Sequence, residues 1–241
     1  MRGAIMQPTY FPWAGYFNLI RSADVFVFLD DAQFERGTWH NRNRVLVGGT
    51  PHWLTVPTLR ERLGCALNEV HADEKLHWRR KHLSLLRQNY GKHAHGGDIL
   101  DLAEQAIGDL RDSVLANLNM RIITEFCRLL QIKTPLLRAS ELGVPGARSV
   151  RVARICDHLK CEEYLSPPGA LEYLLQDRFC SLTPARLVIQ EFQPEPYPQR
   201  GATAFVSHLS LIDVVANLGW GDAAAYLGRG ATTRIIEPTI Q

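Results

Sequence analysis

A run of five apolar residues at 25–29 constrains the fold of this chain more than any other segment. Its Val, Phe and Leu side chains are typical of a strand buried on both faces, as in the middle of a parallel sheet. A shorter apolar segment lies at 4–6, and the apolar positions between the two, 16, 17, 19 and 20, have helical spacing. Strand, helix and strand in this order predict a βαβ unit.

Later segments extend this pattern. We predict strands at 136–137, 164–166 and 186–192, a hairpin across 45–56, and helices that start at 149 and 209. Helical periodicity also runs through 76–131, so the chain is expected to form an α/β fold, a mainly parallel Rossmann-like sheet flanked by helices, with a helical insertion around residues 76–131. No hinge rich in Pro and Gly flanks the insertion, which favours a single domain over 1–241. Residues beyond Gly228 are expected to be loosely held.

Composition and charge narrow the class of protein. The 241 residues are 46% hydrophobic and 22% charged, with a net charge of +2, which is typical of a folded soluble protein and requires no nucleic-acid partner. The five cysteines form no C-x-x-C pair, so we expect reduced thiols and no metal site. No apolar run approaches the ~20 residues of a membrane span, and no signal-peptide pattern is recognisable. A cytoplasmic protein without a membrane span is expected.

Polar residues follow the predicted strands, at the edge where open α/β sheets bind ligands. Asp30 and Asp31 come directly after the apolar run. Either carboxylate could be a general base, and the alternative is a loop cap that accepts backbone N–H groups. Further candidates for substrate binding lie at this edge or near it: Gln7, Tyr10, Gln33, Ser166 and Tyr197.

The segment 39–44, Trp-His-Asn-Arg-Asn-Arg, combines aromatic, amide and cationic side chains. The two arginines, Arg42 and Arg44, can form bidentate hydrogen bonds with phosphate or carboxylate. The two asparagines, Asn41 and Asn43, can form hydrogen bonds with hydroxyl or amide groups. Alternation along an extended segment would place the two arginines on one face and the two asparagines on the other. The alternative is a solvated edge strand.

Two further candidates lie on predicted helices. Lys81 and His82 lie in the middle of one of them, where Lys75, Arg79 and His82 share related faces and could form an anion clamp. A run such as Trp-Arg-Arg-Lys-His is also typical of the solvent-exposed side of a helix. His208 precedes the last predicted helix and could be a general base, while Ser207 or Ser210 would cap that helix. The chain lacks the usual motifs of serine hydrolases, P-loop enzymes, dinucleotide-binding enzymes and zinc proteases.

Several motifs occur in order along almost the whole chain. They are QPTYFPWAGYF at 7–17, ADVFVFLDDAQF at 23–34, WHNRN at 39–43, WLTVP at 53–57 and HLSLID at 208–213. Together they resemble the WbqC-like protein family. Met6 stands where many members have His, and Pro167–Pro168 stands where Gly-Pro is expected.

The resemblance implies a role in surface-polysaccharide (O-antigen) or natural-product biosynthesis. It points to an acyl or aminoacyl transferase, for instance a glycyl transferase, that acts on the amino group of a nucleotide-activated sugar or a similar small amine. Such a reaction needs a base, donors to the developing oxyanion and an anion site. The base would be one of the two Asp residues or His208, and phosphates would lie on Arg42 and Lys81. The acyl group would be oriented by Asn41, Asn43 and Gln7.

The cofactor is not identified by any motif, and a thioester of coenzyme A or of a carrier protein is the expected donor. The expected partners are therefore a small-molecule substrate and an acyl or aminoacyl carrier protein. Two alternatives stay open. The lack of a nucleophile–base pair favours a non-catalytic nucleotide-sugar-binding accessory protein. The layout of 11–24 favours a nucleotidyltransferase-like enzyme, although Trp13 and Tyr16 occupy the neighbourhood of the histidines that such enzymes use.

Overall fold

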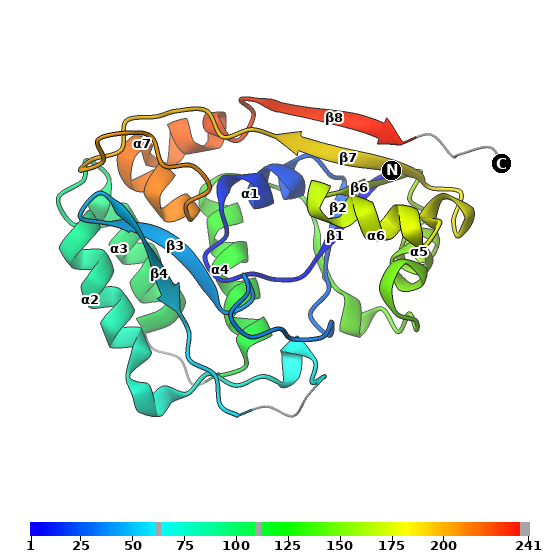
Figure 1. The fold of residues 1–241 in the computed structure, drawn as a ribbon, viewed down its shortest axis with the longest axis horizontal. Coiled ribbons are helices and arrows are strands. Elements are labelled where there is room, and N and C mark those ends of the chain that lie inside the picture. The colour runs from blue at the N-terminus through cyan, green and yellow to red at the C-terminus, as the bar shows by residue number, and fades with distance from the viewer. Residues whose placement is uncertain (61–63, 109–111, 237–241) are drawn as a thin grey trace.

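The computed structural model describes residues 1–60, 64–108 and 112–236. Its main sheet has the strand order β5-β2-β1-β6-β7-β8, and β7 and β8 lie side by side along the top of the view in Figure 1. Neighbouring strands run parallel except for the antiparallel pair β7 and β8. The strands are β1 (Arg2–Met6), β2 (Val25–Phe28), β5 (Leu136–Arg138), β6 (Glu163–Ser166), β7 (Arg186–Phe192) and β8 (Ala231–Ile236).

The predicted βαβ unit is present. Helix α1 (Ala14–Arg21) connects β1 to β2, and the two strands pair in parallel from Gly3 opposite Val25 to Met6 opposite Phe28. All four residues of β2 are buried, because helices cover both faces of the sheet. The prediction of a mainly parallel, Rossmann-like α/β fold is therefore confirmed.

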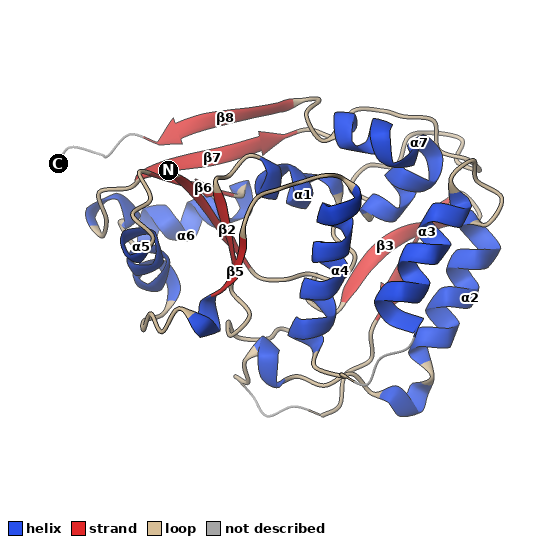
Figure 2. Ribbon diagram, turned by 180° about the vertical axis from the view of Figure 1, so that it is seen from behind, coloured by secondary structure: helices blue, strands red, loops and turns tan. Residues whose placement is uncertain are grey.

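Helices lie on both faces of the sheet (Figure 2). On one face, α1, α4 (Leu115–Leu129) and α7 (Leu211–Tyr226) pack on apolar side chains of the sheet that include Phe26 and Val188. On the other face, α5 (Arg148–His158) and α6 (Leu171–Gln176) pack on side chains that include Val27 and Ile189. None of the helices in the described residues is long and apolar enough to cross a bilayer.

The predicted hairpin forms a second, two-stranded antiparallel sheet of β3 (Arg42–Val47) and β4 (Thr50–Thr55). The helical insertion follows it. It consists of α2 (Trp78–Tyr90), α3 (Gly96–Ala103), a π-helical turn (Glu104–Gly108) and α4. Short 3-10 helices occur at Leu67–Glu69, Glu74–Leu76, Ala139–Glu141, Pro168–Ala170 and Phe179–Ser181.

The expectation of a loosely held tail beyond Gly228 is wrong for residues 231–236, while 237–241 lie outside the described residues. These residues form the edge strand β8, which pairs with β7 from Leu187 opposite Ile236 to Phe192 opposite Ala231. The Nε of Arg234 also donates to Glu191 Oε1 over 3.0 Å. The strand is mostly exposed, so its sequence lacks the apolar alternation by which a strand is recognised.

The strand order places a topological switch point between β1 and β6. The connection after β1 passes through α1 on one face of the sheet, whereas the connection after β6 passes through α6 on the other. In open α/β sheets a ligand crevice forms where neighbouring connections diverge in this way, at the carboxyl ends of the strands. A ligand site is therefore expected at the loops that follow Met6 and Ser166.

Gly15 in the first turn of α1 allows the indole of Trp13 to lie against the helix. A Cβ at Gly15 would come within 2.2 Å of the Trp13 ring, whereas a Cβ at Gly97 in α3 would meet no atom within 4 Å. Gly15→Ala should lower the free energy of unfolding by about 1–3 kcal/mol through overpacking. Gly97→Ala should leave it unchanged or slightly raised. Thermal unfolding of the two variants checks this, and equal midpoints would contradict it.

Candidate functional site

The loop after β1 is held by two buried side-chain amides. Asn43 Nδ2 donates to the carbonyl oxygens of Tyr10 and Phe11 over 3.2 and 2.9 Å. Asn119 Nδ2 donates to the carbonyl oxygens of Pro8 and His40 over 3.0 and 2.8 Å. Because buried carbonyl groups are costly to leave without a partner, the two amides fix the path of the loop at the carboxyl end of β1.

The start of α7 supports the same loop from its other end. The Leu211 backbone N–H donates to the carbonyl of Pro12, and the Ser210 N–H donates to the carbonyl of Arg44, each over 2.8 Å. The Ser210 hydroxyl caps α7 by accepting from the Ile212 N–H over 3.3 Å. His208 has a φ of +57°, a left-handed conformation that is uncommon outside glycine and that persists where the surrounding structure enforces it.

A cavity of about 230 Å³ opens between these segments at the carboxyl end of β1. His208 forms one part of its wall, with its imidazole stacked on the Trp13 indole at a centroid distance of 4.7 Å and an interplanar angle of 29°. The amino-terminal turn of α1 contributes Trp13 and Tyr16 to the lining. The full lining is Met6, Thr9, Trp13, Tyr16, Trp39, Asn43 and His208.

His208 is the titratable group of this cavity that is suited to proton transfer. Its Nδ1 lies 2.9 Å from the Ser207 hydroxyl, and within the described residues its Nε2 has no hydrogen-bond partner. Partial burial, followed by the charge of Arg44, lowers the pKa of His208 below its usual value. The ring is therefore neutral at neutral pH, and a tautomer with the proton on Nδ1 leaves the lone pair of Nε2 free to accept a proton.

A second cavity, of about 490 Å³, lies at the ends of β1 and β2 beside the amino-terminal end of α5. Three predicted site residues, Gln7, Asp31 and Gln33, line it. Asp31 accepts two hydrogen bonds from Arg151, of 2.7 and 2.6 Å. This bidentate ion pair neutralises the carboxylate, so Asp31 is a weaker candidate for a base than its position after β2 suggests.

Asp30 is fully buried and belongs to the scaffold of the strand ends. It accepts from the backbone and hydroxyl of Ser140 over 3.0 and 2.7 Å, and from Nε of Arg138 over 3.3 Å. These donors tie the end of β2 to the segment after β5. The carboxylate has no exposed surface, so a substrate could reach it only if this network opened.

Asn41, Tyr10 and His82 are likewise engaged in internal contacts. The side chain of Asn41 donates to the Val56 carbonyl over 2.9 Å and accepts from the Gly37 N–H over 2.9 Å. The Tyr10 hydroxyl lies 2.9 Å from His82 Nδ1, and both residues are buried. The structure thus brings Tyr10 and His82 together, but inside the core.

Tyr197 and Ser166 also bond within the protein. The Tyr197 hydroxyl donates to Asp213 Oδ2 over 2.7 Å, and the Tyr90 hydroxyl donates to Oδ1 of the same carboxylate over 3.0 Å. Ser166 is buried, and its hydroxyl donates to the Pro167 carbonyl over 3.3 Å. Neither residue lines the cavity beside His208 or the one that contains Asp31.

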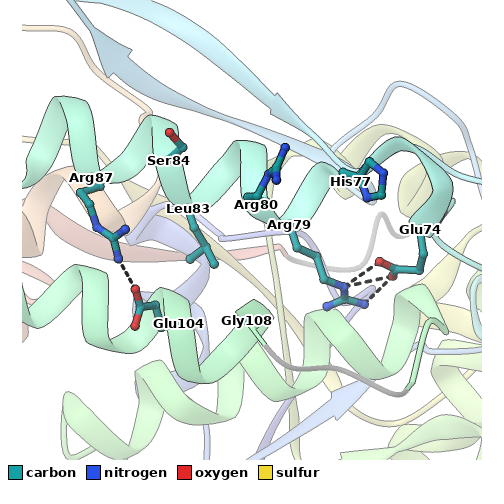
Figure 3. A pocket seen from close by; sticks show the side chains of 9 residues that line it. All are labelled: Glu74, His77, Arg79, Arg80, Leu83, Ser84, Arg87, Glu104 and Gly108. Carbon is teal, nitrogen blue, oxygen red and sulfur yellow. Dashed lines mark hydrogen bonds and ion pairs between the residues drawn. The ribbon is translucent and has the colours of Figure 1, made fainter.

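Lys81 and Arg42 lie on different elements, α2 and β3. Lys81 is exposed on α2, while Arg42 lies on the outer face of the β3–β4 hairpin. A groove of about 580 Å³ along α2 includes its other basic residues (Figure 3). There, Arg79 is held by Glu74 through contacts of 2.6–3.0 Å, and Arg87 is paired with Glu104. Most of the charge along this groove is therefore neutralised within the protein.

Sequence reasoning missed Asn119 and the role of Trp13 as a cavity wall. Asn119 lies in α4 among buried apolar residues such as Leu118 and Ile122, and it is itself fully buried. A polar residue inside an apolar helical stripe was the available signal, since a buried amide requires hydrogen-bond partners. For Trp13 there was no comparable signal, because its position depends on the stacking of His208 from a distant segment.

The buried His82 should make the fold sensitive to acid. Burial lowers its pKa to about 4, although a hydrogen bond to the Thr55 backbone opposes the shift. An unfolded chain binds a proton at this residue below about pH 6.5, whereas the folded protein does so only near pH 4. Because the unfolded state binds the proton more tightly, the free energy of unfolding falls as pH falls through this interval, by at most about 3 kcal/mol. Urea unfolding at pH 7 and pH 4.5 measures this loss.

In His82→Gln the free energy of unfolding should fall less between pH 7 and pH 4.5 than it does in the wild type. His158→Gln, a change at an exposed position of α5, keeps His82 and therefore the full loss. An identical pH dependence in His82→Gln and the wild type would contradict the assignment.

Comparison with known proteins indicates, over most of the chain, the same family that the sequence motifs resemble. The model of the WbqC-like protein family matches residues 7–225. The chain is also similar to the uncharacterized protein Rv1507c of Mycobacterium tuberculosis, with 30% identity over 227 residues that cover 93% of this chain and 96% of the relative. No solved structure matches the chain. The family resemblance noted in the sequence is thus confirmed, and the chain belongs to the WbqC-like protein family.

Proposed function

We propose that the protein is an acyl or aminoacyl transferase that acylates the amino group of a nucleotide-activated sugar or a similar small amine. The observation that carries this proposal is the position of the His208 imidazole, which stacks on Trp13 at the wall of the cavity beside β1. An amine must lose a proton as it becomes an amide, and His208 is the group in this cavity that can accept one.

The transfer step would proceed as follows. The amine nitrogen attacks the carbonyl carbon of a thioester, a C–N bond forms, and the C–S bond breaks. The proton released by the amine passes to Nε2 of His208 and from there to the leaving thiolate. The donor is a thioester of coenzyme A or of a carrier protein.

The surroundings of His208 suit this role. Stacking on Trp13 and the contact of Nδ1 with the Ser207 hydroxyl fix the orientation of the ring. The amino-terminal turn of α1 reaches the cavity through Trp13 and Tyr16. The positive end of the helix dipole at this turn would stabilise negative charge that develops on the carbonyl oxygen.

His208→Ala should reduce turnover by about 10²- to 10⁴-fold, the usual contribution of a general base. Product formation from an amino-sugar nucleotide and an acyl or aminoacyl thioester, followed by mass spectrometry, measures this effect. His158→Ala, at the exposed end of α5 on the other face of the sheet, is the matched control with unchanged turnover. Equal rates in the wild type and His208→Ala would remove His208 from the chemistry.

The dependence of the rate on pH gives a separate test. Since the pKa of His208 is lowered, the rate should stay constant as pH falls to about 6.5 and decline only below that value, where the imidazole becomes protonated. This acid limb should be absent from the residual activity of His208→Ala. Binding of an amino-sugar nucleotide without product from any thioester would contradict the transferase and favour an accessory binding protein.

A further inference from the structure

The outer face of the β3–β4 hairpin carries Arg42, an expected phosphate ligand, together with side chains that the proton transfer at His208 does not use. Arg42 and Arg44 alternate along β3, and across the ladder they pair with Thr55 and Trp53. Directly opposed residues of an antiparallel pair project from the same face, so Arg44 and Trp53 share one face with Arg42. Asn43 and Val45, which alternate with the arginines, are buried on the opposite face.

Two indole rings and two guanidinium groups lie close together on this outer face. The Trp39 and Trp53 ring centroids are 5.4 Å apart at an angle of 45°. The Arg42 guanidinium lies 4.2 Å from the Trp53 centroid, and that of Arg44 lies 6.0 Å from Trp39 and 5.9 Å from Trp53. We call these four residues the Trp–Arg face.

The indoles of the Trp–Arg face are exposed to an unusual degree. Trp39 is 47% exposed and Trp53 is 39% exposed, although large aromatic side chains are mostly buried in folded proteins. The tilted contact between the two rings restricts their motion, so they present a preformed aromatic surface. Such a surface binds flat rings at a low entropic cost.

The positive charges of the Trp–Arg face are not neutralised within the described residues. Neither Arg42 nor Arg44 forms an ion pair with a carboxylate there, and the Nε atoms of both are buried without a hydrogen-bond partner. Arg44 donates through Nη2 to the His208 carbonyl over 3.3 Å. By contrast, Arg151 and Arg79 are each held by a carboxylate of the protein.

We propose that the Trp–Arg face binds nucleoside 5′-diphosphates, with the base stacked on the exposed indoles and the phosphates on Arg42 and Arg44. Guanidinium groups form bidentate hydrogen bonds with phosphate oxygens, and aromatic side chains stack on bases of any sequence. A ligand with both features uses all four residues, whereas phosphate alone leaves the indoles exposed and a nucleoside alone leaves the charges unpaired.

This inference rests on the proposed function in one respect, the adjacency of the two sites. Trp39 belongs to the Trp–Arg face and also lines the cavity that contains His208. A nucleotide on this face therefore lies beside the transfer cavity. The same chemistry has two sources in the proposed reaction, the nucleotide of an activated sugar and the adenosine diphosphate portion of coenzyme A.

Titration calorimetry of the full-length protein tests the assignment with four probes. Uridine diphosphate represents the activated sugar and 3′-phosphoadenosine 5′-diphosphate represents coenzyme A, while uridine and inorganic pyrophosphate supply the base and the phosphates separately. At least one of the diphosphates should bind at least tenfold more tightly than uridine or pyrophosphate. The diphosphate that binds more tightly identifies the source. Pyrophosphate binding as tight as that of either diphosphate would exclude the stacking role of the indoles.

Substitutions on the Trp–Arg face that do not line the cavity locate the binding site. Trp53→Ala and Arg42→Ala should each weaken diphosphate binding by about tenfold or more, and Trp53→Phe should restore most of the loss by keeping an aromatic ring. Arg80→Ala, at an exposed arginine of α2, is the matched control with unchanged affinity. Circular dichroism and thermal unfolding verify that each variant is folded. Diphosphate affinity that is unchanged in both Trp53→Ala and Arg42→Ala would overturn the proposal.

The outcomes for the two proposals are separable. His208→Ala should bind the diphosphate as the wild type does, because its side chain is not part of the Trp–Arg face. Binding that depends on Trp53 and Arg42 in a protein without transfer activity would sustain this inference and reject the transferase. Transfer activity in the wild type, together with a diphosphate affinity that neither Trp53→Ala nor Arg42→Ala changes, would sustain the transferase and reject this inference.

Discussion

The structure of the site depends on two buried amides that hold the loop after β1. Asn43 comes from the hairpin and Asn119 from the helical insertion, and together they pair four backbone carbonyl groups, three of them in this loop. Each such group left buried and unpaired would cost about 1–3 kcal/mol. The loop therefore has one path, and the cavity at the carboxyl end of β1 takes its shape from that path.

The hairpin and the helical insertion therefore contribute side chains to the candidate site as well as to the hydrophobic core. The sheet alone provides the end of β1, but the remaining walls of the cavity come from elsewhere in the chain. Asn43 and Trp39 belong to the hairpin region, and His208 is delivered by the segment before α7. This assembly explains why the recognisable motifs are spread from residue 7 to residue 213, although each is short.

Local patterns were sufficient to predict the βαβ unit, the hairpin and the helical insertion, because each depends on periodicity within a few turns or strands. The pairing of polar residues could not be predicted in this way. Asp30 and Asp31 follow β2 as expected, but Arg138 and Arg151, which bind them, lie more than 100 residues further along the chain. The same limit applies to the surroundings of His208, because Trp13, on which its ring stacks, and Arg44, whose charge helps to lower its pKa, are both distant from it in sequence.

The proposed transfer requires an amine substrate to bind beside His208 in the cavity at the carboxyl end of β1. A crystal structure of the protein soaked with an amino-sugar nucleotide tests this requirement. The substrate nitrogen should lie within about 3.2 Å of Nε2 of His208, with the sugar between Trp13 and Trp39. A well-ordered substrate in the cavity lined by Asp31 and Arg151, or in the groove along α2, with the cavity beside His208 empty, would contradict it.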